Sequence, residues 1–154
     1  MAVQGAFFWF DYSLKKLLDG TLDLDTQTIK AVLLSNAQAV NRTFLGTSNN
    51  AQYSDLTGEL ATANGYTNGG FTLTGVGINR PSAALSIFKS DPLAWTLTSP
   101  ITFKYVLLYS FGATNKDLLM VADMDTGGGS VTPAAGLLQM NPDPTNGWGY
   151  WSQP

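Results

Sequence analysis

The stretch ITFKYVLLY (residues 101–109) carries the clearest strand pattern of the chain and sets the expected fold class. Every second residue in it is large and apolar, which is the period of a strand with one buried face. The predicted buried face consists of Ile101, Phe103, Tyr105, Leu107 and Tyr109. Lys104 falls on the opposite face, where Val106 and Leu108 make the second half apolar as well. The segment is therefore predicted to lie centrally in a sheet.

Other segments of the chain also have strand patterns. Residues 28–35 begin with β-branched side chains and continue as an apolar run, which is typical of a strand covered on both faces. In residues 93–98 the alternation places Trp95 on the buried side, so this side chain is predicted to belong to the core. The remaining strands are expected at residues 71–78, 84–89 and 118–124.

One segment, residues 10–19, has the period of a helix. Its apolar face is predicted to contain Phe10, Leu14, Leu17 and Leu18. Asp11 or Ser13 is expected to cap its start, and Gly20 is expected to end it. About six or seven strands behind one helix predict a mainly β fold: a β-sandwich or jelly-roll-like barrel with a short N-terminal helix.

A glycine run, TGGGS, divides the chain at residues 126–130. It predicts a flexible joint between a β-sandwich domain with an N-terminal helix at residues 1–126 and a Gly-, Pro- and aromatic-rich extension at residues 127–154. The extension is expected to dock on the domain or on a neighbouring chain, so that the whole forms a single domain.

Composition argues against several classes of function. The chain has no cysteine and no histidine, which removes thiolate and imidazole chemistry, and no phosphate-binding loop is present. We therefore expect no enzyme, no catalytic residues, no cofactor and no bound metal. The net charge is −3 and the basic residues are scattered, so no nucleic-acid partner is expected. No apolar run is long enough to span a membrane, and the start does not resemble a signal peptide.

Two pairs of alternate aspartates leave an ion site as an alternative. Asp23 with Asp25, and Asp123 with Asp125, have a spacing that can supply two or three oxygen ligands to calcium. Neither pair matches the twelve-residue calcium loop with its terminal glutamate. Turn formation and strand termination are the favoured interpretation of both pairs.

Large aromatic side chains gather near both ends of the chain. We predict protein–protein contact through them, because four rings in a row cannot all face one core and a proline-rich tail cannot easily bury three. The predicted contact residues are Phe7, Phe8, Trp9, Phe10, Trp148, Tyr150 and Trp151. The polar loop at residues 36–52 is a third candidate contact. The alternative use of exposed rings is a platform for sugars.

The order of motifs along residues 10–126 resembles a group of small structural proteins of tailed-bacteriophage virions. The resemblance rests on GTLDLDTQTIKAVLLS (20–35), YSDLTGELATANGYTNGGFTL (53–73), Trp95, YVLLY (105–109) and LLMVADMD (118–125). No single motif is specific, and the order and spacing carry the likeness.

This resemblance implies a capsid decoration or cement protein, made in the host cytoplasm and located on the phage head. The implied partners are the major capsid protein and copies of this chain, arranged as a trimer. The low charged fraction, 12%, agrees with a surface partly covered by partners. The alternatives are a phage tail component, such as an adaptor or fibre-base subunit, and a carbohydrate-binding β-sandwich module. Deletion of residues 142–154 is expected to weaken particle attachment without unfolding the domain.

Overall fold

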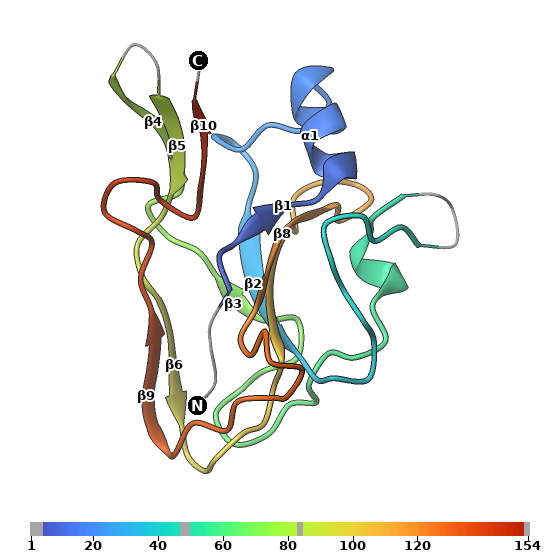
Figure 1. Ribbon diagram of the computed structural model, residues 1–154, viewed down its shortest axis with the longest axis vertical. Coiled ribbons are helices and arrows are strands. Elements are labelled where there is room, and N and C mark those ends of the chain that lie inside the picture. The colour runs from blue at the N-terminus through green and yellow to red at the C-terminus, as the bar shows by residue number, and fades with distance from the viewer. Residues whose placement is uncertain (1–4, 47–49, 83–84, 153–154) are drawn as a thin grey trace.

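A computed structural model of the chain describes residues 5–46, 50–82 and 85–152, with residues 151 and 152 described only as backbone (Figure 1). A five-stranded antiparallel sheet forms the centre, in the order β1-β8-β7-β2-β3. Its strands are β1 (Phe8–Trp9), β2 (Ile29–Leu34), β3 (Phe71–Thr72), β7 (Tyr105–Ser110) and β8 (Leu118–Asp123). As predicted, the strand at the end of ITFKYVLLY, β7, occupies the middle position.

Two smaller antiparallel sheets face this one. The first has the order β10-β5-β4 and the second pairs β6 with β9. Their strands are β4 (Gly77–Ser82), β5 (Leu85–Lys89), β6 (Leu93–Leu97), β9 (Gly136–Met140) and β10 (Gly149–Ser152). The fold is mainly β and sandwich-like, with one short N-terminal helix, as the sequence predicts.

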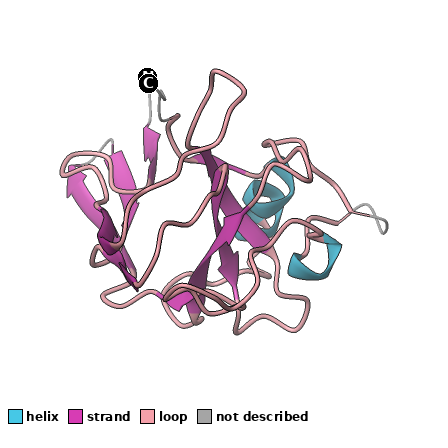
Figure 2. Ribbon diagram, turned by 90° about the horizontal axis from the view of Figure 1, so that it is seen from below, coloured by secondary structure: helices cyan, strands magenta, loops and turns pink. Residues whose placement is uncertain are grey.

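The central strands β2, β7 and β8 of the five-stranded sheet are buried on both faces. In Figure 2 strands of the smaller sheets lie on one side of the central sheet, and helices and loops lie on the other. One face packs against the smaller sheets, in a core that includes Trp95, Phe88 and Leu108. The other face carries a second core, which includes Val32 and Leu107 and is covered by the loops around the 3₁₀ helix η1 (Tyr53–Asp55). This two-sided burial explains why the central strands are continuously apolar and do not alternate.

The predicted common face of residues 101–109 is wrong. Ile101 and Phe103 belong to the core between the sheets, whereas Tyr105 and the alternate residues after it belong to the second core. The face changes because the regular ladder begins only at Tyr105: Phe103 instead forms an isolated bridge with Val131, and the chain bends at Lys104.

Lys104 is buried at this bend, although its place in the sequence suggested a polar face. Its residue is 5% exposed, and its ammonium group donates hydrogen bonds to Asp123 Oδ1 (3.1 Å) and to the carbonyls of Asp125 (2.9 Å) and Gly129 (3.1 Å). One buried cation thus holds the end of β8 and the glycine run together. The glycine run, which was predicted to be a flexible joint, is therefore a hydrogen-bonded loop.

The helix α1 (Asp11–Leu18) begins and ends close to the predicted positions. Neither Asp11 nor Ser13 caps it with a side chain; Phe10 is the N-cap residue, and Ser13 is buried with its hydroxyl donating to the carbonyl of Leu118. Gly20 follows the helix with φ +73°, a left-handed conformation that favours glycine. No helix among the described residues is long and apolar enough to cross a membrane.

The region after the glycine run joins the sheets of the domain itself. β9 pairs with β6 along its full length, from Leu93 opposite Met140 to Leu97 opposite Gly136, and β10 pairs with β5. Neither strand was predicted from the sequence. Deleting residues 142–154 would remove both β10 and the buried Trp148, so we now expect this deletion to lower stability.

We predict that Lys104→Met lowers the free energy of unfolding by about 2–3 kcal/mol, because buried carbonyls and Asp123 lose their shared donor. Lys15→Met is the matched control: the Lys15 side chain is 74% exposed and pairs with Asp19 on the helix surface, so its loss costs less than about 0.5 kcal/mol. Urea unfolding measures both variants. Equal midpoints for the two would contradict a structural role for the buried cation.

Candidate functional site

A groove of about 570 Å³ lies where the two ends of the described chain meet, between β1 and β10. We call it the terminal groove. It is formed by residues 5–9 and 146–150 together with Leu14, Arg42, Asn141 and Asp143. It therefore brings together most of the aromatic residues that the sequence singled out as contact residues.

The floor of the terminal groove is held in place by Trp148. Its indole N–H donates to Ser90 Oγ (2.9 Å), and its ring meets the edge of Phe7 with the ring centres 5.0 Å apart. The next residue, Gly149, has no room for a side chain, because the backbone passes close to Trp9 here. A Cβ at this position would lie 2.6 Å from the Trp9 indole nitrogen. The contact between Phe7 and Trp148 closes the sandwich on this side.

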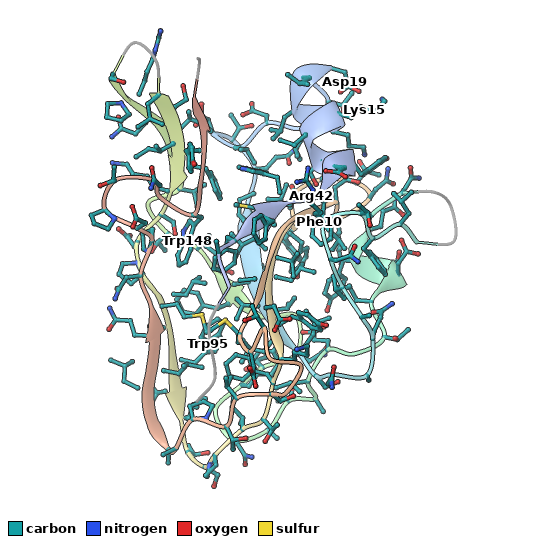
Figure 3. All side chains as sticks on the ribbon, in the orientation of Figure 1. Phe10, Lys15, Asp19, Arg42, Trp95 and Trp148 are labelled. Atoms are coloured by element: carbon teal, nitrogen blue, oxygen red, sulfur yellow. The ribbon has the colours of Figure 1, made fainter. Side chains whose placement is uncertain are left out.

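Three of the seven predicted contact residues are buried in the domain. Trp9 is 8% exposed and Trp148 is 5% exposed, and both belong to the core between the sheets. Phe10 is fully buried in the second core, on the opposite face of the five-stranded sheet. Figure 3 shows Trp148 and Trp95 on the side of the smaller sheets, with Phe10 on the other side. These three side chains pack mainly inside the domain and offer a partner little surface in this conformation.

The others have different positions. Phe8 is 54% exposed and Tyr150 is 52% exposed, on β1 and β10 respectively, and both line the terminal groove. Phe7 is half-buried against Trp148. Trp151 is described only as a backbone position of β10, so its side chain lies outside the described part of the structure. For Phe8 and Tyr150, contact with a partner stays a prediction.

Polar side chains line the terminal groove beside the rings. Arg42 donates to Asp11 Oδ1 from both Nε (3.0 Å) and Nη2 (2.7 Å), which neutralises its charge locally. Asp143 Oδ1 accepts the backbone N–H groups of Thr145 (2.9 Å) and Asn146 (2.7 Å), and so fixes the turn before Trp148. These contacts hold the rim in a defined shape.

A second groove, of about 770 Å³, lies between α1 and the β4–β5 hairpin. We call it the helix–hairpin groove. Its lining is mainly apolar, from Leu14, Leu17, Leu18, Leu22, Leu24 and Ile78, and also includes Asp23, Asp25 and Ser86. Leu18 is 89% exposed and Ile78 is 40% exposed. The apolar face predicted for residues 10–19 is therefore divided, since Phe10 is buried in the domain whereas Leu18 extends from it.

The acidic pairs are occupied by hydrogen bonds within the chain. Asp23 accepts the N–H of Asp25 (2.9 Å) and the hydroxyl of Thr26 (2.8 Å). Asp123 pairs with Lys104, and Asp125 Oδ1 accepts the N–H of Gly127 (3.0 Å). In the described part of the chain, no group of three or more His, Cys, Asp or Glu residues is arranged to hold a metal ion.

The loop at residues 36–52 covers the second core. Val40 and Ala51 are buried there, and Arg42 ties the loop to α1 through Asp11. Leu45 is 50% exposed, and residues 47–49 lie outside the described part of the structure. As a surface for a partner, this loop remains a prediction.

A network around Glu59, the single glutamate, was not predicted from the sequence. Glu59 accepts hydrogen bonds from the hydroxyls of Tyr53 and Tyr66 (2.7 Å for Tyr66) and from the N–H of Gly69 (2.6 Å). Burial, with the hydrogen bonds and charge of Glu59, raises the pKa of Tyr53 and Tyr66 well above 10.0. Burial and the charge of Glu59 raise the pKa of Tyr109 to about 12.

This network is structural in its geometry. Tyr109 stacks on Tyr53 with ring centres 4.5 Å apart and donates to the carbonyl of Gly69 (2.9 Å). The residues from Glu59 to Gly69 are thereby tied to β2 and β7. The only signal in the sequence was the spacing of the tyrosines around a lone glutamate, and that spacing does not show which rings approach it.

Comparisons with protein-family models, with curated proteins and with solved structures found no match to this chain.

We predict that Phe10→Ala lowers the free energy of unfolding by about 3–5 kcal/mol, because it leaves a cavity in the second core. Phe8→Ala is the matched control from the same aromatic run; its ring is mostly exposed, and the change is expected to cost less than about 1 kcal/mol. Denaturant unfolding of both variants distinguishes the core residue from the exposed one. A larger loss for Phe8→Ala would contradict this assignment.

We expect an alkaline titration to show a late-ionising class of tyrosines. The folded-state pKa of Tyr53, Tyr66 and Tyr109 lies above the ordinary value of 10.0, so their contribution to stability is complete below pH 10.0 and is lost as the pH rises. For Tyr109 the loss falls between pH 10.0 and about 12. Ultraviolet absorbance of phenolate measures the ionisation.

The control for this titration is the same protein in denaturant, where all tyrosines ionise near their ordinary pKa of about 10. Tyr66→Phe removes one of the late-ionising tyrosines. It is expected to lower the free energy of unfolding by about 1 kcal/mol, since Glu59 loses a hydrogen-bond donor. A native protein whose tyrosines all ionise in one step near pH 10 would refute the network.

Proposed function

We propose that this chain is a structural protein of a tailed-bacteriophage virion, and specifically a decoration or cement protein of the head. The order of sequence elements over residues 10–126 supports this proposal. It is supported further by a sequence without cysteine or histidine and with 12% charged residues, which suits a protein that works by contact.

The observation that carries the proposal is the helix–hairpin groove. Leucines from α1 and the segment after it face Ile78 of β4 across the groove, and Leu18 is 89% exposed. Leu22 and Leu24 are buried at the base of the groove, whereas Leu18 and Ile78 are exposed at its sides. Exposed apolar side chains gathered in this way commonly mark a site of protein contact. Because the groove lies between a helix and a hairpin, a side chain or loop of a partner can be enclosed on two sides.

The proposed partners are the major capsid protein and other copies of this chain, arranged as a trimer. A decoration protein stabilises a shell by burying apolar surface across the boundaries between capsomers. Stable contacts of this kind bury on the order of 800 Å² on each partner. The exposed rings of Phe8 on β1 and Tyr150 on β10 are candidates for further contacts.

A tail component, such as an adaptor or fibre-base subunit, would use the same surface chemistry. Location on the particle separates the two roles. A cryo-electron reconstruction of phage particles assembled in cells expressing this chain is therefore the deciding experiment. We expect density for trimers of this chain on the outer shell, at symmetry or pseudo-symmetry points. Density in the tail would replace the head assignment, and particles without such density would overturn both roles.

A variant pair tests the role of the groove in attachment. Leu18→Asp places a charge in the apolar lining and is expected to weaken binding to particles at least about tenfold, because burying a carboxylate opposes the contact. Leu137→Asp is the matched control, since Leu137 is 65% exposed on β9 and does not line the groove. Co-sedimentation with particles measures both, and equal loss in the two variants would argue against the helix–hairpin groove.

A further inference from the structure

We propose that the helix–hairpin groove binds a second copy of this chain, with Phe111 as the inserted side chain and Lys30 and Lys116 facing the aspartates of the groove. The inference rests on the proposed role of this groove as a contact site, and it names the partner that fills it. Its basis is a match between two surfaces, one acidic and one basic, whose charges are not paired within their own chain.

The helix–hairpin groove is acidic as well as apolar. Asp23 and Asp25 are the charged side chains of its lining, and neither belongs to an ion pair of the residues that the structure describes. Asp25 Oδ1 accepts the N–H of Ile78 (3.2 Å), while its Oδ2 accepts no hydrogen bond from the described residues. The occupant that complements this groove is an apolar group with positive charge beside it.

Phe111 is an apolar group of this kind. It follows β7 and is 42% exposed. The ammonium groups of Lys30 and Lys116 lie 4.2 Å and 5.1 Å from the centre of its ring. Neither lysine belongs to an ion pair within the described part of the chain. An exposed ring with two unbalanced cations therefore offers what the groove lacks.

Two other exposed apolar side chains have no such charge beside them. Phe8 shares the terminal groove with Arg42, whose charge is already balanced by Asp11. Leu137 lies on β9, and neither β9 nor its partner strand β6 contains a basic residue. Charge complementarity therefore favours Phe111 as the inserted residue.

The backbone of Lys116 also points to a use for its side chain. Its φ of +49° lies in the left-handed region, which favours glycine or asparagine over lysine. Within its own chain the ammonium group has ring contacts, with Phe111 and with Tyr53 at 5.6 Å, and such contacts are weak on an exposed surface. An ion pair with a second copy accounts for a lysine at this position.

The contact is between chains, because Phe111 does not line the groove of its own chain. The Phe111 N–H instead donates to the carbonyl of Thr28 (2.8 Å), shortly after Asp25 in the sequence. A volume of about 770 Å³ leaves room for a ring. The lysine stems can lie along the apolar lining while their charged ends stay at the rim. Since the two surfaces differ, the copies meet head to tail.

The test measures self-association of the purified full chain by sedimentation over the micromolar range. The parent is expected to associate, whereas Phe111→Asp and Leu18→Asp are each expected to be monomeric. A mixture of these two variants should form heterodimers, because one retains the groove and the other retains the ring. Leu137→Asp is the matched control: Leu137 is exposed outside both surfaces, and this variant should associate like the parent.

A second pair of variants tests the charges. Lys116→Gly is expected to weaken association about tenfold. In the monomeric Leu18→Asp background it should keep the thermal midpoint, because the left-handed backbone suits glycine. Asp25→Asn keeps an acceptor for the Ile78 N–H but loses the charge, and is also expected to weaken association about tenfold. Combined, the two changes should weaken association by less than the product of their separate effects.

The contact is overturned by a parent chain that stays monomeric, by association that survives Phe111→Asp, or by a mixture of variants that forms no heterodimers. Particle binding that is lost in Leu18→Asp but kept in Phe111→Asp would assign the groove to another protein and overturn it as well. The role in the virion is tested separately. Self-association through both surfaces in a chain absent from particles would refute that role alone, and monomers bound to particles would refute this contact alone.

Discussion

The burial of both faces of the β2–β7–β8 ladder is the constraint on which the rest of the molecule depends. An antiparallel sheet commonly exposes one face to water, but here both faces are apolar and must be covered. The smaller sheets cover one face, and the loops around η1 cover the other. Two polar groups near the ladder are paired within the chain: the Ser13 hydroxyl donates to the carbonyl of Leu118, and Lys16 Nζ donates to Asp117 Oδ2 at 2.8 Å. For Lys16, burial lowers the pKa, but the hydrogen bond and charge of Asp117 outweigh it and raise the pKa above its usual value.

The sequence predicted the parts of the fold that depend on local period. The doubly covered strand at residues 28–35 and the helix at residues 10–19 have strong apolar patterns and form where expected, whereas the central strand begins only at Tyr105. The single strand predicted at residues 71–78 is wrong, because β3 ends at Thr72 and β4 begins at Gly77 in another sheet. The strands β9 and β10 were missed because glycine and proline interrupt their neighbourhood, and only pairing with β6 and β5 makes them regular. The change of face at Lys104 was missed for a related reason. It follows from hydrogen bonds to carbonyls of residues 125 and 129, which no local pattern encodes.

In the candidate sites too, features set by the local sequence were predicted and features set by distant contacts were not. The sequence identified the aromatic runs near both ends, and the structure brings most of them to one groove. The argument that four consecutive rings cannot face one core holds, but the fold has two cores. Trp9, the last residue of β1, enters one core, and Phe10, the N-cap of α1, enters the other. Trp9 and Phe10 therefore pack inside, and Phe8 alone is mostly exposed. The helix–hairpin groove was not predictable, because the exposure of Leu18 depends on where the β4–β5 hairpin lies relative to α1.

The packing of Phe7 on Trp148 has a consequence for how the protein is made. The two rings belong to opposite ends of the described chain, and Trp148 comes directly before β10, which pairs with β5. During synthesis, the early segments therefore wait with an apolar ladder open on one side until β10 has left the ribosome. Folds dominated by such distant pairings form in milliseconds to seconds, more slowly than helical bundles. This interval exposes the nascent chain to chaperones, or to association with neighbouring nascent copies, before its own last strands close the sandwich.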